Sequence, residues 1–172
     1  MKRGAFIGGV LAAVATAGAA HAQATATTTG EARASVVRTL AMASRSPLSF
    51  GLIAADQAAF SVQVTPAGAI SATRQGVLVP SPVSAGSFEV SGEPNRVYSV
   101  DLPASINLSA GGQGMTVTGL QLQFSGAQSQ GGSGLLASDG RQVFNVGGTL
   151  GVAASQAPGD YVGSYVVTAR YQ

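Results

Sequence analysis

The sequence contains no cysteine and no tryptophan, and its single histidine and single lysine, His21 and Lys2, both stand within the first 22 residues. Without cysteine the chain forms no disulfide and offers neither a thiolate nucleophile nor a thiolate ligand for zinc. From residue 23 onward it also lacks the histidine of a Ser–His–Asp site and the lysine of a Schiff base. We therefore expect no enzymatic activity, no cofactor and no metal site.

The first 22 residues have the pattern of a secretion signal. Lys2 and Arg3 form a positive start, residues 5–19 an apolar run, and Ala20-His21-Ala22 a small-x-small cleavage site. The apolar run is short for a membrane span, and no second one follows. The prediction is an exported protein with no membrane span in its mature form, which passes through the periplasm to the cell surface or an extracellular fibre.

Charge is balanced once the signal is removed. The remaining 172 − 22 = 150 residues have the length of one domain. They carry 9 − 2 = 7 basic residues, all arginine, against seven acids, so their formal charge is zero. Binding to nucleic acid needs a basic patch, and none is present, so nucleic acid is not an expected partner.

Apolar and polar residues alternate in short segments along the rest of the chain. Residues 60–64 and 98–102 show this period of two, and the turn dipeptide Asp139-Gly140 leads into another such segment at residues 143–146. No segment shows the period of an amphipathic helix. The pattern predicts an all-β fold, a sandwich of short strands.

The predicted domain covers residues 35–172 and follows an N-terminal extension, residues 23–34. A first strand is predicted over residues 32–42. The Gly/Ser/Gln-rich residues 125–134 are predicted to form an exposed loop.

The last fourteen residues, Gly159 to Gln172, are predicted to form a long strand that follows the turn residues Pro158-Gly159. Side chains alternate across a strand, so one face carries Tyr161, Gly163, Tyr165, Val167, Ala169 and Tyr171. A long strand at a chain terminus is an unpaired edge unless something covers it. We interpret this edge as the place where function resides.

This ending resembles the C-terminal strand of chaperone–usher fimbrial subunits, the pilins and related spore-coat-type proteins, in its penultimate Tyr171, its Gly159 and the alternate apolar residues between them. Residues 48–51, 86–92 and 146–150 resemble a narrower, pilin-like family of secreted bacterial domains of unknown function. The chain departs from many pilins in lacking their disulfide. The resemblance implies an immunoglobulin-like β-sandwich that lacks one strand and is completed by a donor strand from a neighbour.

The resemblance also implies partners and site residues. The partners are like or related subunits, a periplasmic chaperone and an outer-membrane usher. The interface with subunit or chaperone would comprise Gly159, Tyr161, Tyr165, Val167, Ala169 and Tyr171. The donor strand would present Ala24, Ala26, Thr28, Gly30 and Ala32, whose side chains are small and stabilise a joint less than valine or isoleucine would.

Two other interpretations remain open. The chain could be a self-complete secreted β-sandwich, a binding or envelope-surface module, with a contact surface formed by residues 125–134 or by the four tyrosines, Tyr98, Tyr161, Tyr165 and Tyr171. Glu89 and Glu93, with Arg96 nearby, are the closest acidic pair for calcium or glycosidase-like chemistry, but a solvated loop edge explains them more simply.

Overall fold

The computed structural model describes residues 25–125, 129, 130 and 132–172. The predicted signal peptide, residues 1–22, and the predicted donor residue Ala24 lie outside the described residues. Residues 25–35 belong to a unit of their own, without regular structure, in which every residue is exposed. The folded unit comprises residues 36–172. The described residues contain no helix that is long and apolar enough to cross a membrane.

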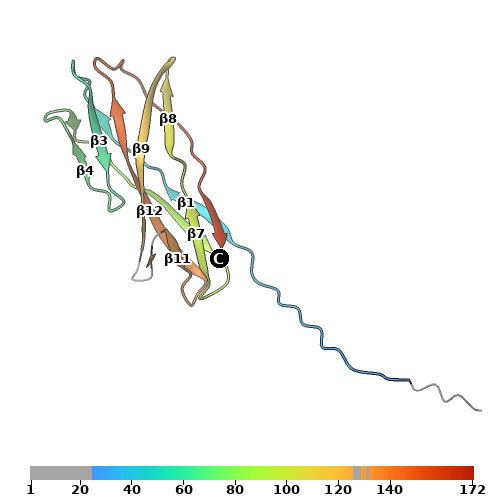
Figure 1. Cartoon of the computed structure of the whole chain (residues 1–172). Coiled ribbons are helices and arrows are strands. Elements are labelled where there is room, and N and C mark those ends of the chain that lie inside the picture. The colour runs from blue at the N-terminus through green and yellow to red at the C-terminus, as the bar shows by residue number, and fades with distance from the viewer. Residues whose placement is uncertain (1–24, 126–128, 131) are drawn as a thin grey trace, which may run out of the picture. The chain divides into compact units, whose positions relative to one another are not determined.

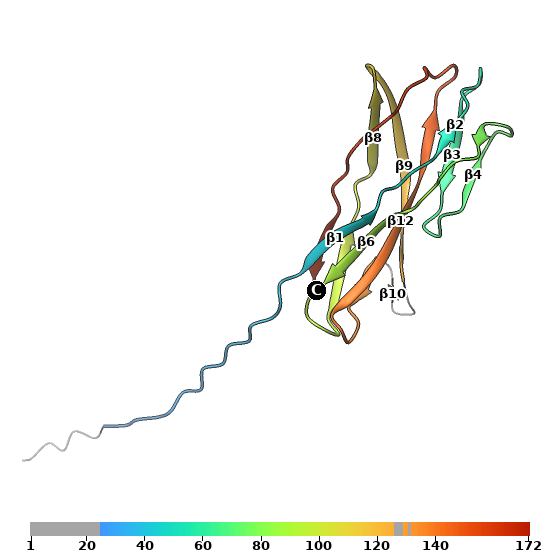
Figure 2. The same ribbon diagram turned by 180° about the vertical axis from the view of Figure 1, so that it is seen from behind.

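Two twelve-residue strands, β9 (Gln113–Phe124) and β12 (Arg141–Val152), pair antiparallel in the middle of the larger sheet (Figures 1 and 2). The other edge of β12 pairs first with β6 (Gly86–Ser91) and then with β3 (Phe60–Val64). The outer strands are β1 (Ala41–Ser46) beside β6, β4 (Ile70–Ala72) beside β3, and β8 (Ser105–Ala110) beside β9.

Glycine permits the change of partner along β12. A Cβ atom at Gly147 would collide with the backbone oxygen of Val64, and one at Gly148 would lie 2.8 Å from Cγ1 of Val117. Neighbouring chains can approach this closely only where a side chain is missing. The sheet can therefore attach β6 and β3 to the same edge of one strand.

A second sheet contains the end of the chain. Its order is β10 (Ser129–Gln130), β11 (Ser133–Leu135), β7 (Val97–Asp101) and β13 (Thr168–Tyr171), all antiparallel. A small ribbon of β2 (Leu52–Ile53) and β5 (Leu78–Val79) completes the strands.

The inward faces of the strands form two apolar clusters. The first cluster contains Phe50, Phe60, Val62, Val64, Val77, Ile106, Val117, Leu150 and Val152. The second cluster contains Val90, Tyr98, Val100, Phe124, Leu136, Phe144 and Val146. Since β9 and β12 contribute to both clusters, these two strands join the halves of the core.

The structure confirms the all-β prediction, with antiparallel sheets curled as in a β-sandwich. The alternating residues 60–64 form β3, which pairs with β4, and the turn predicted at Asp139-Gly140 leads into β12. Gly140 has a φ of 77°, which glycine adopts without strain, and the Asp139 carboxylate accepts a 2.9 Å hydrogen bond from the backbone N–H of Arg141.

Three predicted boundaries are wrong. The first strand begins at Ala41 rather than at residue 32, and residues 32–39 are all exposed, the apolar Val36 and Val37 included. The predicted loop at residues 125–134 contains the short strands β10 and β11. The final strand is regular only from Thr168, with an isolated bridge at Val162, because the chain bends close to β8 between them.

Candidate functional site

The C-terminal segment, defined as residues 159–172, shows the predicted two faces. Its inward side chains, which are half-buried, are Tyr161, Tyr165, Val167, Ala169 and Tyr171. The side chains between them are exposed, and Val162 and Val166 are 70% and 78% accessible. The inward face packs on both clusters, Tyr165 on the first and the last three side chains of its row on the second.

One edge of the C-terminal segment is paired. The N–H of Val162 donates to the oxygen of Ser109 at 3.2 Å, and the N–H of Gln172 donates to the oxygen of Val97 at the same distance. Alternate N–H groups of a strand point to opposite edges. Val162 therefore directs its backbone groups toward β8, and Thr168, Arg170 and Gln172 direct theirs toward β7, whereas Ala169 directs its backbone groups toward the other edge. Among the described residues, no strand pairs with that other edge.

The start of the folded unit borders the same opening. Strand β1 pairs only with β6 among the described strands, and Figures 1 and 2 both show the C-terminal segment running beside it. The segment of residues 40–50, which includes β1, has half-buried side chains at Leu40, Met42, Ser46 and Leu48 and ends at the buried Phe50, while Ser44 is exposed. Two strand edges without a partner thus lie along one opening, and the side chains beneath them are half covered.

Tyr171 closes one end of this opening. Its hydroxyl donates a 2.9 Å hydrogen bond to the backbone oxygen of Arg38 and accepts a 2.7 Å hydrogen bond from the backbone N–H of Glu93. The Arg96 guanidinium lies 5.5 Å from the ring centre. Gly92 leaves room for the hydroxyl, since a Cβ atom there would collide with it. Tyr171 therefore joins the end of the C-terminal segment to the start of the folded unit, near Arg38.

Tyr165 crosses the opening halfway along it. A Cβ atom on Gly86 would lie 2.6 Å from the Tyr165 hydroxyl and 3.5 Å from the Cβ of Leu48. The Phe88 ring meets the Tyr165 ring edge to face, with centroids 6.1 Å apart. Burial in this position raises the pKa of Tyr165.

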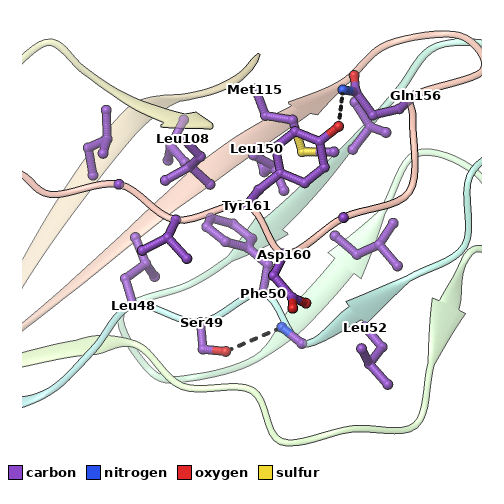
Figure 3. Close-up of a pocket in the computed structure, with 18 of the residues that line it drawn as sticks. Leu48, Ser49, Phe50, Leu52, Leu108, Met115, Leu150, Gln156, Asp160 and Tyr161 are labelled. Atoms are coloured by element: carbon purple, nitrogen blue, oxygen red, sulfur yellow. Dashed lines mark hydrogen bonds between the residues drawn. The ribbon is translucent and has the colours of Figure 1, made fainter. Parts of the chain in front are cut away.

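Beyond Tyr165 the opening leads into a cleft of about 520 Å³ (Figure 3). One wall is formed by residues 47–55 and the other by residues 156–163. The floor consists of apolar side chains from β8, β9 and β12, namely Ile106, Leu108, Met115, Val117, Leu150 and Val152. We call this space the terminal cleft. Its floor is suited to apolar side chains.

Hydrogen bonds and one glycine fix the second wall. Gln156 donates from Nε2 to the Tyr161 hydroxyl at 2.7 Å (Figure 3). That hydroxyl donates to the backbone oxygen of Ala157 at 2.7 Å. Gly163 lies against β8 so closely that a Cβ atom would collide with the backbone oxygen of Asn107.

Asp160 is the single charged residue in the lining of the terminal cleft. In Figure 3 its side chain points from the second wall toward the wall that carries Ser49 and Phe50. No ion pair between described residues includes Asp160, whereas Asp56, Glu89 and Asp101 each pair with arginine. No pattern in the sequence distinguishes this carboxylate from the other acidic residues.

The structure places the predicted interface residues as follows. All six border the opening, and Gly159, Tyr161 and Tyr165 line the terminal cleft itself. Of the predicted donor residues, the described ones lie exposed in the unit that ends at residue 35, namely Ala26, Thr28, Gly30 and Ala32.

The structure does not support two other sites considered from the sequence. Tyr98 is fully buried, so it cannot contribute to a contact surface formed by the four tyrosines. Glu89 pairs with Arg45 and Arg141, while Glu93 accepts a hydrogen bond from the N–H of Arg38, so the two acids act separately. Within the described residues no group of three or more acidic, histidine or cysteine residues is arranged to hold a metal ion.

Comparison with known proteins identifies one family. The sequence pattern of a domain of unknown function, DUF4402, matches residues 40–171, which is nearly the whole folded unit. The search of curated proteins gave no match. The search of solved structures gave none either.

Proposed function

The chain belongs to the DUF4402 family of domains of unknown function, and we propose that it is a structural subunit of a fimbria-like cell-surface fibre. Its subunits would be joined by donor-strand complementation at the opening beside the C-terminal segment. The observation that carries this proposal is the pair of unpartnered strand edges, on β1 and on the C-terminal segment, that border half-buried apolar side chains.

Strand addition would pair the free strand edges of the opening and cover its half-buried apolar side chains at the same time. Backbone groups of an incoming strand pair with the exposed edge, and its alternate side chains enter the space between the edges. Each apolar side chain that becomes buried contributes about 1.5–3 kcal/mol. A joint with several such side chains dissociates very slowly, which is what a fibre requires.

The resemblance to chaperone–usher subunits extends this proposal to assembly. An exported chain with an exposed edge is prone to aggregate until it is covered. A periplasmic chaperone would cover the edge first, and an outer-membrane usher would replace the chaperone by the next subunit at the cell surface.

Two observations favour the alternative, a self-complete secreted binding module. The C-terminal segment is already held at both ends, by the Tyr171 hydroxyl and by the bridge between Val162 and Ser109. A cleft of about 520 Å³ also falls within the range of small-molecule sites, roughly 300–1,000 Å³.

A pair of proline substitutions separates the two functions. Proline removes one backbone N–H, and an edge strand tolerates it where that N–H faces away from the sheet. Ala169→Pro removes an N–H from the exposed edge, whereas Arg170→Pro, the matched control, removes one that faces β7. We expect Ala169→Pro to leave the isolated fold intact and to abolish assembly, and Arg170→Pro to destabilise the fold itself.

Assembly is measured in the cells that produce the protein. Material sheared from their surface is separated on a detergent gel with and without boiling. We expect the wild-type chain in a high-mass ladder that collapses on boiling, and the Ala169→Pro chain to be missing from that ladder. A wild-type chain that is only ever released as a free monomer would support the secreted module instead.

A further inference from the structure

We propose that the terminal cleft selects an extended segment from a non-identical protein, one with large aliphatic side chains at alternate positions and a cationic residue opposite Asp160. This inference rests on the proposed function and specifies its partner. It implies that the N-terminal extension of an identical copy, residues 23–34, does not occupy the cleft. We call this extension the leader.

Unpaired backbone groups along the walls of the cleft favour a polypeptide as its occupant. Between Val162 and Thr168 the described chain forms no ladder, and the first wall pairs only on its outer side, through the bridge between Ser49 and Ser84 and through β2 with β5 among the described strands. A small apolar molecule fills space but does not pair with backbone N–H and C=O groups. An extended segment does both.

The volume of the cleft calls for large side chains. Its floor presents leucine, isoleucine, valine and methionine side chains across about 520 Å³. The leader offers only alanine, threonine and glycine on its predicted donor face. Such side chains would leave voids, and atoms that line a void lose their contact partners.

The larger residues that follow the leader are tied to their own domain. Val36 and Val37 immediately precede Arg38. The N–H of Arg38 is bound to the Glu93 carboxylate at 3.0 Å, and its oxygen is bound to the Tyr171 hydroxyl at 2.9 Å. These valines are therefore held beside their own fold and cannot extend deep into a second copy.

The charge of Asp160 also favours some occupants of the cleft over others. An occupant that covers the cleft removes water from Asp160, and a buried carboxylate is costly unless a cation pairs with it. No ion pair between described residues supplies that cation. The leader carries one charge of each sign, Glu31 and Arg33, and these two side chains pair with each other at 2.8 Å. Both residues alternate with the predicted donor face, so they lie on the opposite face of an extended strand. A segment whose lysine or arginine is free to pair with Asp160 is therefore favoured over the leader.

The test uses the secreted chain with its leader in place and a set of synthetic twelve-residue peptides. The first peptide has the sequence of residues 23–34. The others carry leucine or isoleucine at the five donor positions and one lysine, glutamine or glutamate, placed near either end because the strand direction is not fixed. Affinity is measured by fluorescence anisotropy, and hydrogen exchange of residues 163–169 reports pairing at the edge.

We expect the aliphatic lysine peptide to protect residues 163–169 and to bind at least about tenfold more tightly than its glutamate counterpart, the equivalent of one close charge pair. Asp160→Asn should remove this preference, and Asp160→Lys should reverse it. Ala169→Pro, the edge-blocked control, should bind no peptide. Asp160 is exposed, so these substitutions leave the core unchanged.

Each other outcome decides against the inference in its own way. If the leader peptide protects the edge and binds as tightly as the aliphatic peptides, the partner is an identical copy; the inference fails and strand addition stands. If the lysine preference persists in Asp160→Asn, the charge selection fails. If no peptide protects residues 163–169, or an apolar dye binds the cleft while the edge stays unprotected, the proposed function fails as well.

Discussion

Strand β12 and the C-terminal segment have the same sequence pattern and different surroundings. Both alternate inward, mostly apolar side chains with outward side chains that are more exposed. Strand β12 has neighbours along both edges, and its inward Phe144 and Val146 are completely buried. The C-terminal segment has a neighbour along one edge, and its inward Val167 and Ala169 are only half-buried. Alternation therefore determines which way a side chain points, and the neighbouring strands determine how far it is buried.

The largest expected effect comes from truncating one inward residue in each region. Phe144 stacks on Phe88 at 5.3 Å and meets Phe124 at 5.8 Å, so Phe144→Ala should leave a cavity and cost about 3–5 kcal/mol. Val167→Ala removes half-covered methyl groups and should cost about 1 kcal/mol or less. Chemical denaturation measures both. Equal costs would show that the C-terminal segment is covered as completely as β12.

The contrast between the regions was partly predictable from sequence. Alternation within residues 60–64 and 143–146 and the Asp139-Gly140 turn are local signals, and they gave the strands β3 and β12 correctly. The direction of the C-terminal side chains followed from the same rule. Which edge would remain without a partner did not follow, since strand pairing is decided between distant parts of the chain.

The errors have physical causes as well. Gly134 lies in a Gly/Ser-rich stretch that suggested a loop, yet it belongs to a strand because its missing side chain makes room for Tyr98, Phe124 and Gln142. The terminal cleft was not predicted, because its floor comes from three strands and its walls from the two ends of the folded unit. Asp160, next to a turn glycine, resembled an ordinary solvent-exposed residue.

An intermediate effect is expected at Tyr171, whose hydroxyl links the C-terminal segment to Arg38 and Glu93. Tyr171→Phe removes two hydrogen bonds, from Glu93 and to Arg38, and should cost about 1–3 kcal/mol. It should also speed hydrogen exchange around residues 38–42, since β1 loses its link to the end of the chain. The measurement is native-state hydrogen exchange together with chemical denaturation.

Tyr161→Phe is the matched control for this effect. The Tyr161 hydroxyl also makes two hydrogen bonds, but both partners, Gln156 and Ala157, are within five residues of it. Its loss should loosen the second wall of the terminal cleft and leave exchange at residues 38–42 unchanged. Faster exchange there in both variants would mean that Tyr171 has no special part in joining the ends of the fold.

The smallest effect is expected at Tyr98, on the strand that pairs with β13. Its hydroxyl is buried and has no hydrogen-bond partner among the described residues, and burial raises the pKa of Tyr98. The unfolded chain, with a tyrosine pKa near 10, then loses the proton first as pH rises, so this contribution to stability is complete below about pH 10 and is lost above it. Tyr98→Phe should leave stability at pH 7 unchanged or raise it by about 1 kcal/mol, and should lessen the alkaline loss. Denaturation at pH 7 and pH 11 measures both, and a clear loss of stability at pH 7 would show that the hydroxyl is bonded after all.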